Sequence, residues 1–190
     1  MKTTINKTFE IDRPIKEVWN FISDPNKIVT CVPGARLTNS IDEKTYEGTV
    51  NMKIGPVATS FKGKIEMTTL DQANYAMEIN GKGVDTKGKG SASMVLAAKL
   101  DDNGHNTTTV NNTMNISIAG KLAQFGSRMI VDVSDQVFKQ FLNNFRNQME
   151  LNTADSESAE QVVEEAKPIN ALSLFFSTIW ASILRLFGKS

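Results

Sequence analysis

The alternation of apolar and polar residues over Arg36–Ile118 constrains the fold of this chain more than any other feature. Apolar residues occupy alternate positions at 46–54, 61–67 and 75–80. A period of two is typical of β-strands that have one covered face and one wet face. Turn-forming residues interrupt the pattern at Asp42-Glu43, Gly55-Pro56, Asp71-Gln72 and Asp101–Gly104. The sequence therefore predicts an antiparallel meander.

Helical patterns flank this meander on both sides. A candidate strand at Thr3–Ile11 precedes a helix that Pro14 starts and Asp12 caps, and residues 26–29 form a second short helical turn. After the meander, a long helix over Ala123–Met149 has apolar residues every three to four positions. Such a helix can cross the covered face of the sheet. The sequence thus predicts an α+β fold of the helix-grip type, an antiparallel sheet wrapped around a long C-terminal helix.

Glycines on the covered face of the predicted sheet indicate a ligand cavity. In a strand predicted over Asp85–Leu100, Gly88 and Gly90 share one face with Met94, and Gly63 lies on the covered face in the same way. Missing side-chain volume beneath a helix leaves room, and methionines would give that room a pliable wall. The predicted wall consists of Met52, Phe61, Met67, Met94, Phe125 and Met129. The alternative is a sharply bent sheet whose glycines serve curvature, with the helix filling the gap.

The last fifth of the chain differs from the rest. Thr153–Lys167 is acidic, and Ile169–Phe187 then carries Arg185 as its only charge. The pattern favours an amphipathic helix that lies in the membrane surface, over a transmembrane helix, a helix that docks into a partner, or a core helix. The predicted anchor residues are Leu172, Phe175, Phe176, Ile179, Trp180, Ile183, Leu186 and Phe187. The chain is therefore divided into a globular domain (1–150), an acidic flexible linker (151–168) and an anchoring helix (169–190).

Charge balance and the scarcity of reactive side chains exclude several functions. Residues 1–150 hold 18 lysines and arginines against 16 carboxylates, which gives no electrostatic footprint for nucleic acid. The N-terminus lacks an apolar signal region, so the single Cys31 is expected in a reducing cytosol. The only histidine, His105, lies in a turn-forming stretch, and no cluster has the spacing of metal ligands. We therefore expect neither a metal site nor catalysis by this chain.

Four segments carry a family resemblance. They are Asp24–Ala35 (DPNKIVTCVPGA), Lys53–Gly63 (KIGPVATSFKG), Gly81–Ala92 (GKGVDTKGKGSA) and Gly120–Ile130 (GKLAQFGSRMI). Together they resemble the CoxG family of carbon monoxide dehydrogenase proteins, within the START-like, polyketide-cyclase-like (SRPBCC) superfamily of helix-grip folds that also includes Bet v 1. The resemblance covers about residues 1–147, and the hydrophobic tail is similar to that of family members.

The resemblance implies an accessory protein of a molybdenum-containing dehydrogenase of the CO dehydrogenase type, at the cytoplasmic face of the cell membrane. Its cavity would bind a respiratory isoprenoid quinone, menaquinone or ubiquinone, and would link the enzyme to the membrane quinone pool; no covalent cofactor is implied. The Pro33-Gly34 loop and the Gly120–Gly126 turn would frame the cavity mouth. Its walls would be Trp19, Phe61, Ile65, Met67, Met94, Phe125 and Met129.

Polar contacts to the ligand are not singled out by the sequence. Candidate donors to the quinone carbonyls are backbone N–H groups near Gly34 or Gly88, the hydroxyl of Tyr46, and Arg128. Three other functions stay open: a non-catalytic scaffold that only recruits the dehydrogenase, a lipid-transfer domain, and a cyclase- or hydrolase-like enzyme. The lack of an acid–base pair disfavours the third.

Overall fold

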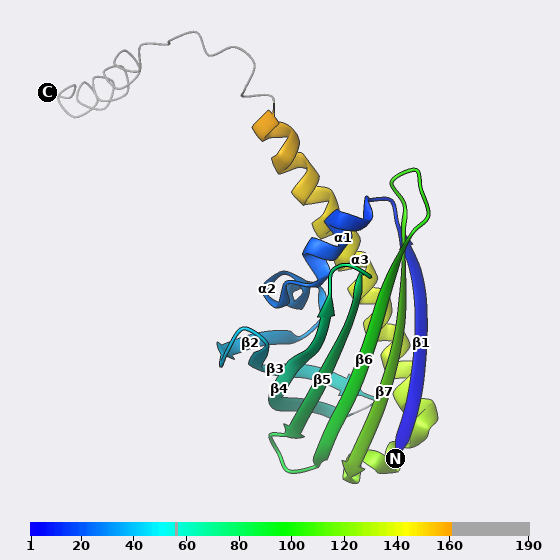
Figure 1. Ribbon diagram of the computed structural model, residues 1–190. Helices are drawn as coiled ribbons and strands as arrows, with labels where there is room; N and C mark the ends of the chain where they lie inside the picture. The colour runs from blue at the N-terminus through cyan, green and yellow to red at the C-terminus, as the bar shows by residue number, and fades with distance from the viewer. Residues whose placement is uncertain (56, 161–190) are drawn as a thin grey trace, which may run out of the picture. The chain divides into compact units, whose positions relative to one another are not determined.

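The described part of the chain is built on one antiparallel sheet. The computed structural model describes residues 1–55 and 57–160, with the backbone alone for 152–160. Within these residues the sheet has seven strands in the order β1-β7-β6-β5-β4-β3-β2 (Figure 1). The strands are β1 (Lys2–Ile11), β2 (Ala35–Ser40), β3 (Thr45–Ile54), β4 (Val57–Asp71), β5 (Ala76–Asp85), β6 (Gly90–Asp102) and β7 (Thr108–Gly120).

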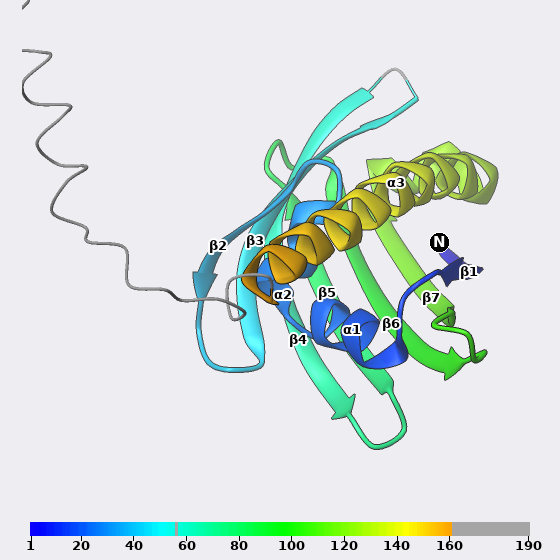
Figure 2. The same ribbon diagram turned by 90° about the horizontal axis from the view of Figure 1, so that it is seen from above.

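Helices occupy the concave side of the sheet. Between β1 and β2 lie α1 (Ile15–Ile22), α2 (Pro25–Ile28) and the short 3-10 helix η1 (Val29–Cys31). After β7 come a second 3-10 helix, η2 (Lys121–Phe125), and the long α3 (Gly126–Glu160). Figure 2 shows the sheet curving around α3, from β1 on one side to β2 on the other. The predicted α+β helix-grip fold, with its order of one strand, short helices, six strands and a long helix, is confirmed.

Several predicted boundaries were wrong in detail. The residue that precedes α1 is Pro14, and no side chain caps this helix, so Asp12 is not its cap. Helix α3 begins at Gly126 rather than Ala123, because Lys121–Phe125 first form the 3-10 turn η2. At its other end α3 continues to Glu160, so the first ten residues of the predicted flexible linker are helical.

The chain beyond Glu160 lies outside the described residues. This includes the rest of the predicted linker and all eight predicted anchor residues (Leu172, Phe175, Phe176, Ile179, Trp180, Ile183, Leu186 and Phe187). No helix among the described residues has the length and hydropathy needed to cross a bilayer. Residues 1–150 form one compact unit, which contains the core described next.

The core consists of two clusters on the concave face of the sheet. The first joins β1 and α1 to the far part of α3, where the Phe145 ring lies 5.3 Å from that of Phe21 and 6.1 Å from that of Phe9. The second lies near the start of α3 and contains Ile54, Ile118, Leu122 and Ile130. The helix is therefore packed against the sheet by two separate buried groups.

A charged side chain joins the edge strand β1 to the middle of α3. Lys7 lies on the concave face of β1, and its amine lies 2.8 Å from the Asp135 carboxylate and 5.5 Å from the centroid of the Phe138 ring. An inward-pointing lysine is a known device against edge-to-edge association of sheets. Here it also contributes to holding α3 along β1.

Candidate ligand cleft

Glycines lie in register across the concave face. Gly48 on β3 pairs with Gly63 on β4, which in turn pairs with Gly83 on β5. A Cβ atom on Gly63 would overlap the carbonyl oxygen of Lys82, and one on Gly48 would lie 2.6 Å from that of Arg36. At these two positions the backbones approach too closely for a side chain, which is the signature of a sharp bend. The curvature alternative therefore accounts for Gly48 and Gly63.

The remaining glycines on this face have different surroundings. A Cβ atom on Gly83 would make only ordinary contacts, the nearest at 3.5 Å, so this position leaves volume free. On Gly81 it would lie 2.9 Å from Met94 Cγ, so the Met94 side chain occupies that space. Ile65, Met94 and Leu96 belong to neither core cluster and are only half-buried, although their face is the one that α3 covers. Open space therefore reaches the sheet between the two clusters.

A cleft of about 640 Å³ opens between the β3–β4 hairpin and α3. Its volume falls within the range typical of small-molecule sites, roughly 300–1,000 Å³. Four parts of the chain meet there: the loop before β2, the β3–β4 hairpin, the β5–β6 turn and the middle of α3. The lining residues are Pro33, Gly34, Asn51, Met52, Lys53, Ala58, Thr59, Ser60, Lys87, Val133, Gln136, Val137 and Gln140.

The lining combines an apolar wall with amide donors. Met52 from β3 and Val133 and Val137 from α3 provide apolar surface, and Met52 adds the adaptability of a thioether. Gln136 and Gln140 are one helical turn apart on α3, so both amides lie along the same side of the cleft. An amide NH₂ group donates to carbonyl oxygens without requiring a charge. The cleft can therefore hold a flat apolar molecule that carries carbonyl groups.

The predicted donors have other roles in the structure. The Tyr46 hydroxyl donates to the Glu43 carbonyl at 3.0 Å, in the β2–β3 turn, and the Gly88 N–H donates to the Asp85 carbonyl at 3.0 Å. Arg128 is exposed and is not among the residues that line the cleft. The sequence analysis missed Gln136 and Gln140, whose signal was a pair of amides spaced i, i+4 beside the apolar stripe of a helix that covers a sheet.

The twelve predicted ligand-binding residues are distributed over the domain. Pro33, Gly34 and Met52 line the cleft, and Phe61, Ile65 and Met94 follow on the concave face, farther from the hairpin tip. Phe125 and Met129 pack against the cluster near the start of α3, whereas Trp19 and Met67 are buried in the other cluster. Two glycines lie elsewhere. Gly88 is in the exposed turn between β5 and β6, so the predicted strand over Asp85–Leu100 was wrong there, and Gly90 pairs with Gly120 at the end of the sheet.

A buried carboxylate fixes the β5–β6 turn next to the cleft. Asp85 is 4% exposed and accepts a hydrogen bond from the hydroxyl of Thr59, a cleft residue. Its other oxygen accepts from the backbone N–H groups of Lys87 at 3.0 Å and Lys89 at 2.9 Å. The Thr59 hydroxyl, followed by the Lys89 N–H, holds the pKa of Asp85 below its ordinary value. Both effects favour the charged carboxylate.

The stability of the domain should therefore depend on Asp85 in acid. Because its pKa is lowered on folding, Asp85 stabilises the folded state above the unfolded pKa, and this contribution is lost as pH falls through the folded pKa. We expect Asp85→Asn to lower the melting temperature at neutral pH and to flatten its decline below pH ~4. Thermal melts at several pH values check this. The control is Asp132→Asn, an exposed carboxylate on α3, which should change neither; an unaltered acid limb for Asp85→Asn would contradict the assignment.

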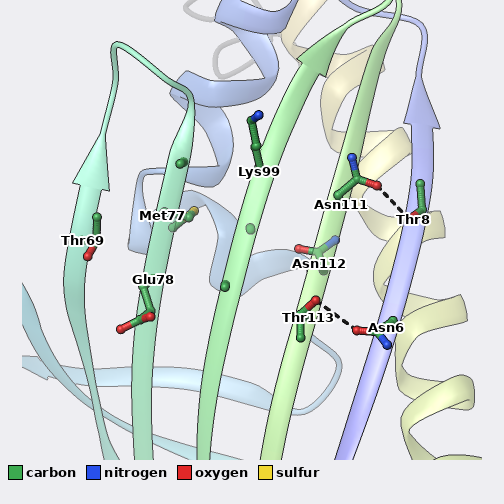
Figure 3. Close-up of a pocket in the computed structure, with 12 residues that line it drawn as sticks. Asn6, Thr8, Thr69, Met77, Glu78, Lys99, Asn111, Asn112 and Thr113 are labelled. Carbon is green, nitrogen blue, oxygen red and sulfur yellow. Dashed lines mark hydrogen bonds between the residues drawn. The ribbon is translucent and has the colours of Figure 1, made fainter.

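A second depression, of about 510 Å³, lies on the outer face of the sheet (Figure 3). Hydroxyl and amide side chains face each other across β1 and β7: Thr8 donates to Asn111 at 2.9 Å, and Thr113 donates to Asn6 at 3.0 Å. Ala76 and Ala97 leave the trough shallow between these pairs and Glu78. These polar groups already satisfy one another, and the trough lies on the face opposite to α3.

Reactive side chains are few in the described part of the chain. Cys31 is buried, and burial raises the pKa of its thiol, a change that disfavours the nucleophilic thiolate. His105 has a positive φ in the turn after β6. The described residues contain no group of three or more His, Cys, Asp or Glu residues that could hold a metal ion.

The curved sheet, the long helix on its concave face and the cleft between them define a helix-grip protein of the kind that binds ligands beneath the helix. Solved structures agree on the fold. A conserved protein from Geobacillus kaustophilus is 22% identical with a TM-score of 0.71, covering 78% of this chain and 95% of its own. The Zhui aromatase/cyclase from Streptomyces sp. R1128 is 12% identical with a TM-score of 0.59, covering 79% and 94%. Ara h 8.0201 is 10% identical with a TM-score of 0.53, covering 78% and 98%.

The family is shown by the sequence itself. The family model for CoxG, a carbon monoxide dehydrogenase protein, matches residues 8–150. The chain therefore belongs to the CoxG family, and the predicted resemblance is confirmed. No curated protein matches the chain.

Proposed function

We propose that this chain is a ligand-binding accessory protein of a molybdenum-containing dehydrogenase of the CO dehydrogenase type. In this proposal the cleft holds an isoprenoid quinone, menaquinone or ubiquinone, and the C-terminal tail holds the protein at the cytoplasmic face of the cell membrane. The protein then links the dehydrogenase to the membrane quinone pool and performs no chemistry of its own. Membership of the CoxG family supports the enzyme partner, and the sequence of the tail supports the membrane.

The cleft between the β3–β4 hairpin and α3 is the observation that carries the ligand. A quinone needs an apolar slot for its ring and isoprenoid chain, which Met52, Val133 and Val137 supply. It also needs donors for two carbonyl oxygens, which the amides of Gln136 and Gln140 can supply. The half-buried apolar side chains beyond the cleft, on the face that α3 covers, provide surface for the chain of the ligand.

The experiment is native mass spectrometry with organic extraction of the full chain, expressed in a quinone-producing bacterium. The proposal expects an isoprenoid quinone at nearly one per chain. A protein that carries no quinone and takes none up on titration would overturn the ligand. The function would then be that of a scaffold which only recruits the enzyme, an alternative favoured by the close backbone approach at Gly48 and Gly63. A phospholipid in place of quinone would indicate lipid transfer.

Filling the cleft should weaken quinone binding selectively. Val137→Trp adds an indole to the α3 wall of the cleft, and overpacking costs about 1–3 kcal/mol, so we expect the Kd for quinone to rise at least about tenfold. Quinone titration in detergent measures this, with thermal melts to show that the fold is retained. The matched control is Val95→Trp, because Val95 is 38% exposed on the outer face of the sheet. Equal affinity of both variants would place the ligand elsewhere.

A further inference from the structure

The near-neutral charge of the domain conceals a strong separation of charge along the sheet. Half of the 18 lysines and arginines of residues 1–150 fall in four segments, 1–4, 48–64, 80–93 and 115–132. These segments contain two carboxylates, Asp85 and Asp132, and Asp85 is buried in hydrogen bonds. Their net charge is therefore +7, and the rest of the domain carries −5.

These four segments meet at one end of the fold. The amine of Met1 donates to the Ile118 carbonyl at 2.8 Å, and the Leu122 N–H donates to the Lys89 carbonyl at 3.2 Å. The Thr86 N–H donates to the Ser60 carbonyl at 2.8 Å, which joins the β5–β6 turn to β4. Figure 1 shows the N-terminus, the end of β7 and the β5–β6 turn together at this end.

Several of these lysines form a continuous row on the outer face of the sheet. The pairing register places Lys64, Lys82, Ser93, Ser117 and Lys2 in one line across β4, β5, β6, β7 and β1. Four strand spacings make this line about 19 Å long, and Glu47 on β3 ends it. Lys62 lies in the adjacent row, opposite Val84. Together with the Lys53 and Lys87 rims of the cleft, we call this the basic surface.

The basic surface is not explained by the stability of the fold. Lys64 and Lys82 lie directly opposite each other, an arrangement of like charges that destabilises a sheet. Within the described residues, no carboxylate lies within 4.0 Å of the amines of Lys62, Lys64 or Lys82. Beside them Val84 is 59% exposed. Unpaired lysines around an exposed apolar side chain suit an interface with anionic groups.

We propose that the basic surface docks on an anionic lipid bilayer and turns the mouth of the cleft toward it. The inference rests on the proposed function, in which the cleft ligand comes from the membrane. Anionic lipids present negative charge over a plane, which matches a broad sheet face better than it matches a narrow groove. Lys53 and Lys87 line the cleft itself, so lysines that meet the headgroups bring the cleft opening to the bilayer.

The test uses the full chain with Phe175→Ser and Trp180→Ser, which weaken the proposed tail anchor, and vesicles without quinone. Vesicles of phosphatidylcholine with and without phosphatidylglycerol are compared at low salt. We expect binding that requires phosphatidylglycerol and weakens as salt is raised. Lys62→Gln, Lys64→Gln and Lys82→Gln together should weaken it about 100-fold, since each lysine near such a surface contributes roughly a fivefold effect.

The matched control is Lys16→Gln, Lys44→Gln and Lys139→Gln, which removes the same charge from exposed lysines outside the basic surface. It should leave vesicle binding within about twofold, because these lysines lie outside the docking face. An equal loss in both triple variants, or no loss in the first, overturns the docking surface; the second outcome is also the one expected if an acidic protein or the acidic linker occupies it. Quinone titration in detergent should be the same for both triple variants. Lysine-dependent vesicle binding without quinone binding would leave the basic surface and remove only the ligand.

Discussion

Gly63→Val is expected to destabilise the domain by about 3 kcal/mol or to prevent it from folding. The added side chain would overlap the carbonyl oxygen of Lys82 and would point at Gly83 Cα. The colliding atoms belong to backbone that is fixed in the β4–β5 ladder, so no rotamer change relieves the overlap. Denaturant or thermal unfolding of the full chain measures the loss, with a fall in melting temperature of roughly 6–12 °C for a domain of this size.

The opposite residue supplies the control for this prediction. Gly83→Ala places a methyl group on the same row of the sheet, one strand away, where its nearest neighbour would be 3.5 Å distant. We expect a change of less than about 1 kcal/mol, because the contact is an ordinary one. If the two variants were equally stable, the sharp bend at Gly63 would be refuted.

Phe175→Ser together with Trp180→Ser is expected to release the protein from membranes. Both residues are predicted on the apolar face of the tail, outside the described residues. Burying one large apolar side chain contributes about 1.5–3 kcal/mol, so removing two should lower membrane partitioning by roughly 10²–10⁴-fold. Flotation of the full chain with vesicles of phosphatidylcholine, a neutral lipid, at physiological salt measures this without the electrostatic contribution.

Changes on the polar face of the tail control for altered expression or helicity. Asn170→Ser with Ser177→Thr should leave flotation nearly unaltered, because these positions are predicted to face water. Flotation of the serine variant at the level of the natural chain would show that the tail is not the anchor. Retention of bound quinone by that variant is expected, since the cleft lies within residues 33–140.

Residue patterns predicted most of the fold because each strand and helix follows a strong local period. The alternation of β3 and β4 and the apolar stripe of α3 led to the correct order of elements and to the correct covered face. The turn at residues 86–89 was missed because its lysines and glycines continue the alternation of the flanking strands. The Asp85 side chain, which holds this turn by long-range contact with Thr59, has no local signature.

The site was harder to predict than the fold. Glycine in a strand marks either a cavity or a close backbone approach, and only the pairing of Gly63 with Gly83 separates the two roles. The amides of Gln136 and Gln140 belong to the polar side of a helical pattern, and the curvature of the sheet brings them to the cleft. The separation of charge was hidden because net charge sums over residues that the topology places at opposite ends.

The two core clusters give α3 the mechanics of a beam supported at its ends. Phe145 seats one part of the helix and Ile130 the other, while the turns between them face a sheet whose side chains are only half-buried. Regions with fewer buried contacts open at lower free energy than the rest of a domain. Small outward excursions of the β3–β4 hairpin from the middle of α3 can therefore occur while both supports stay intact. A bulky hydrophobic guest can enter such a domain without melting it.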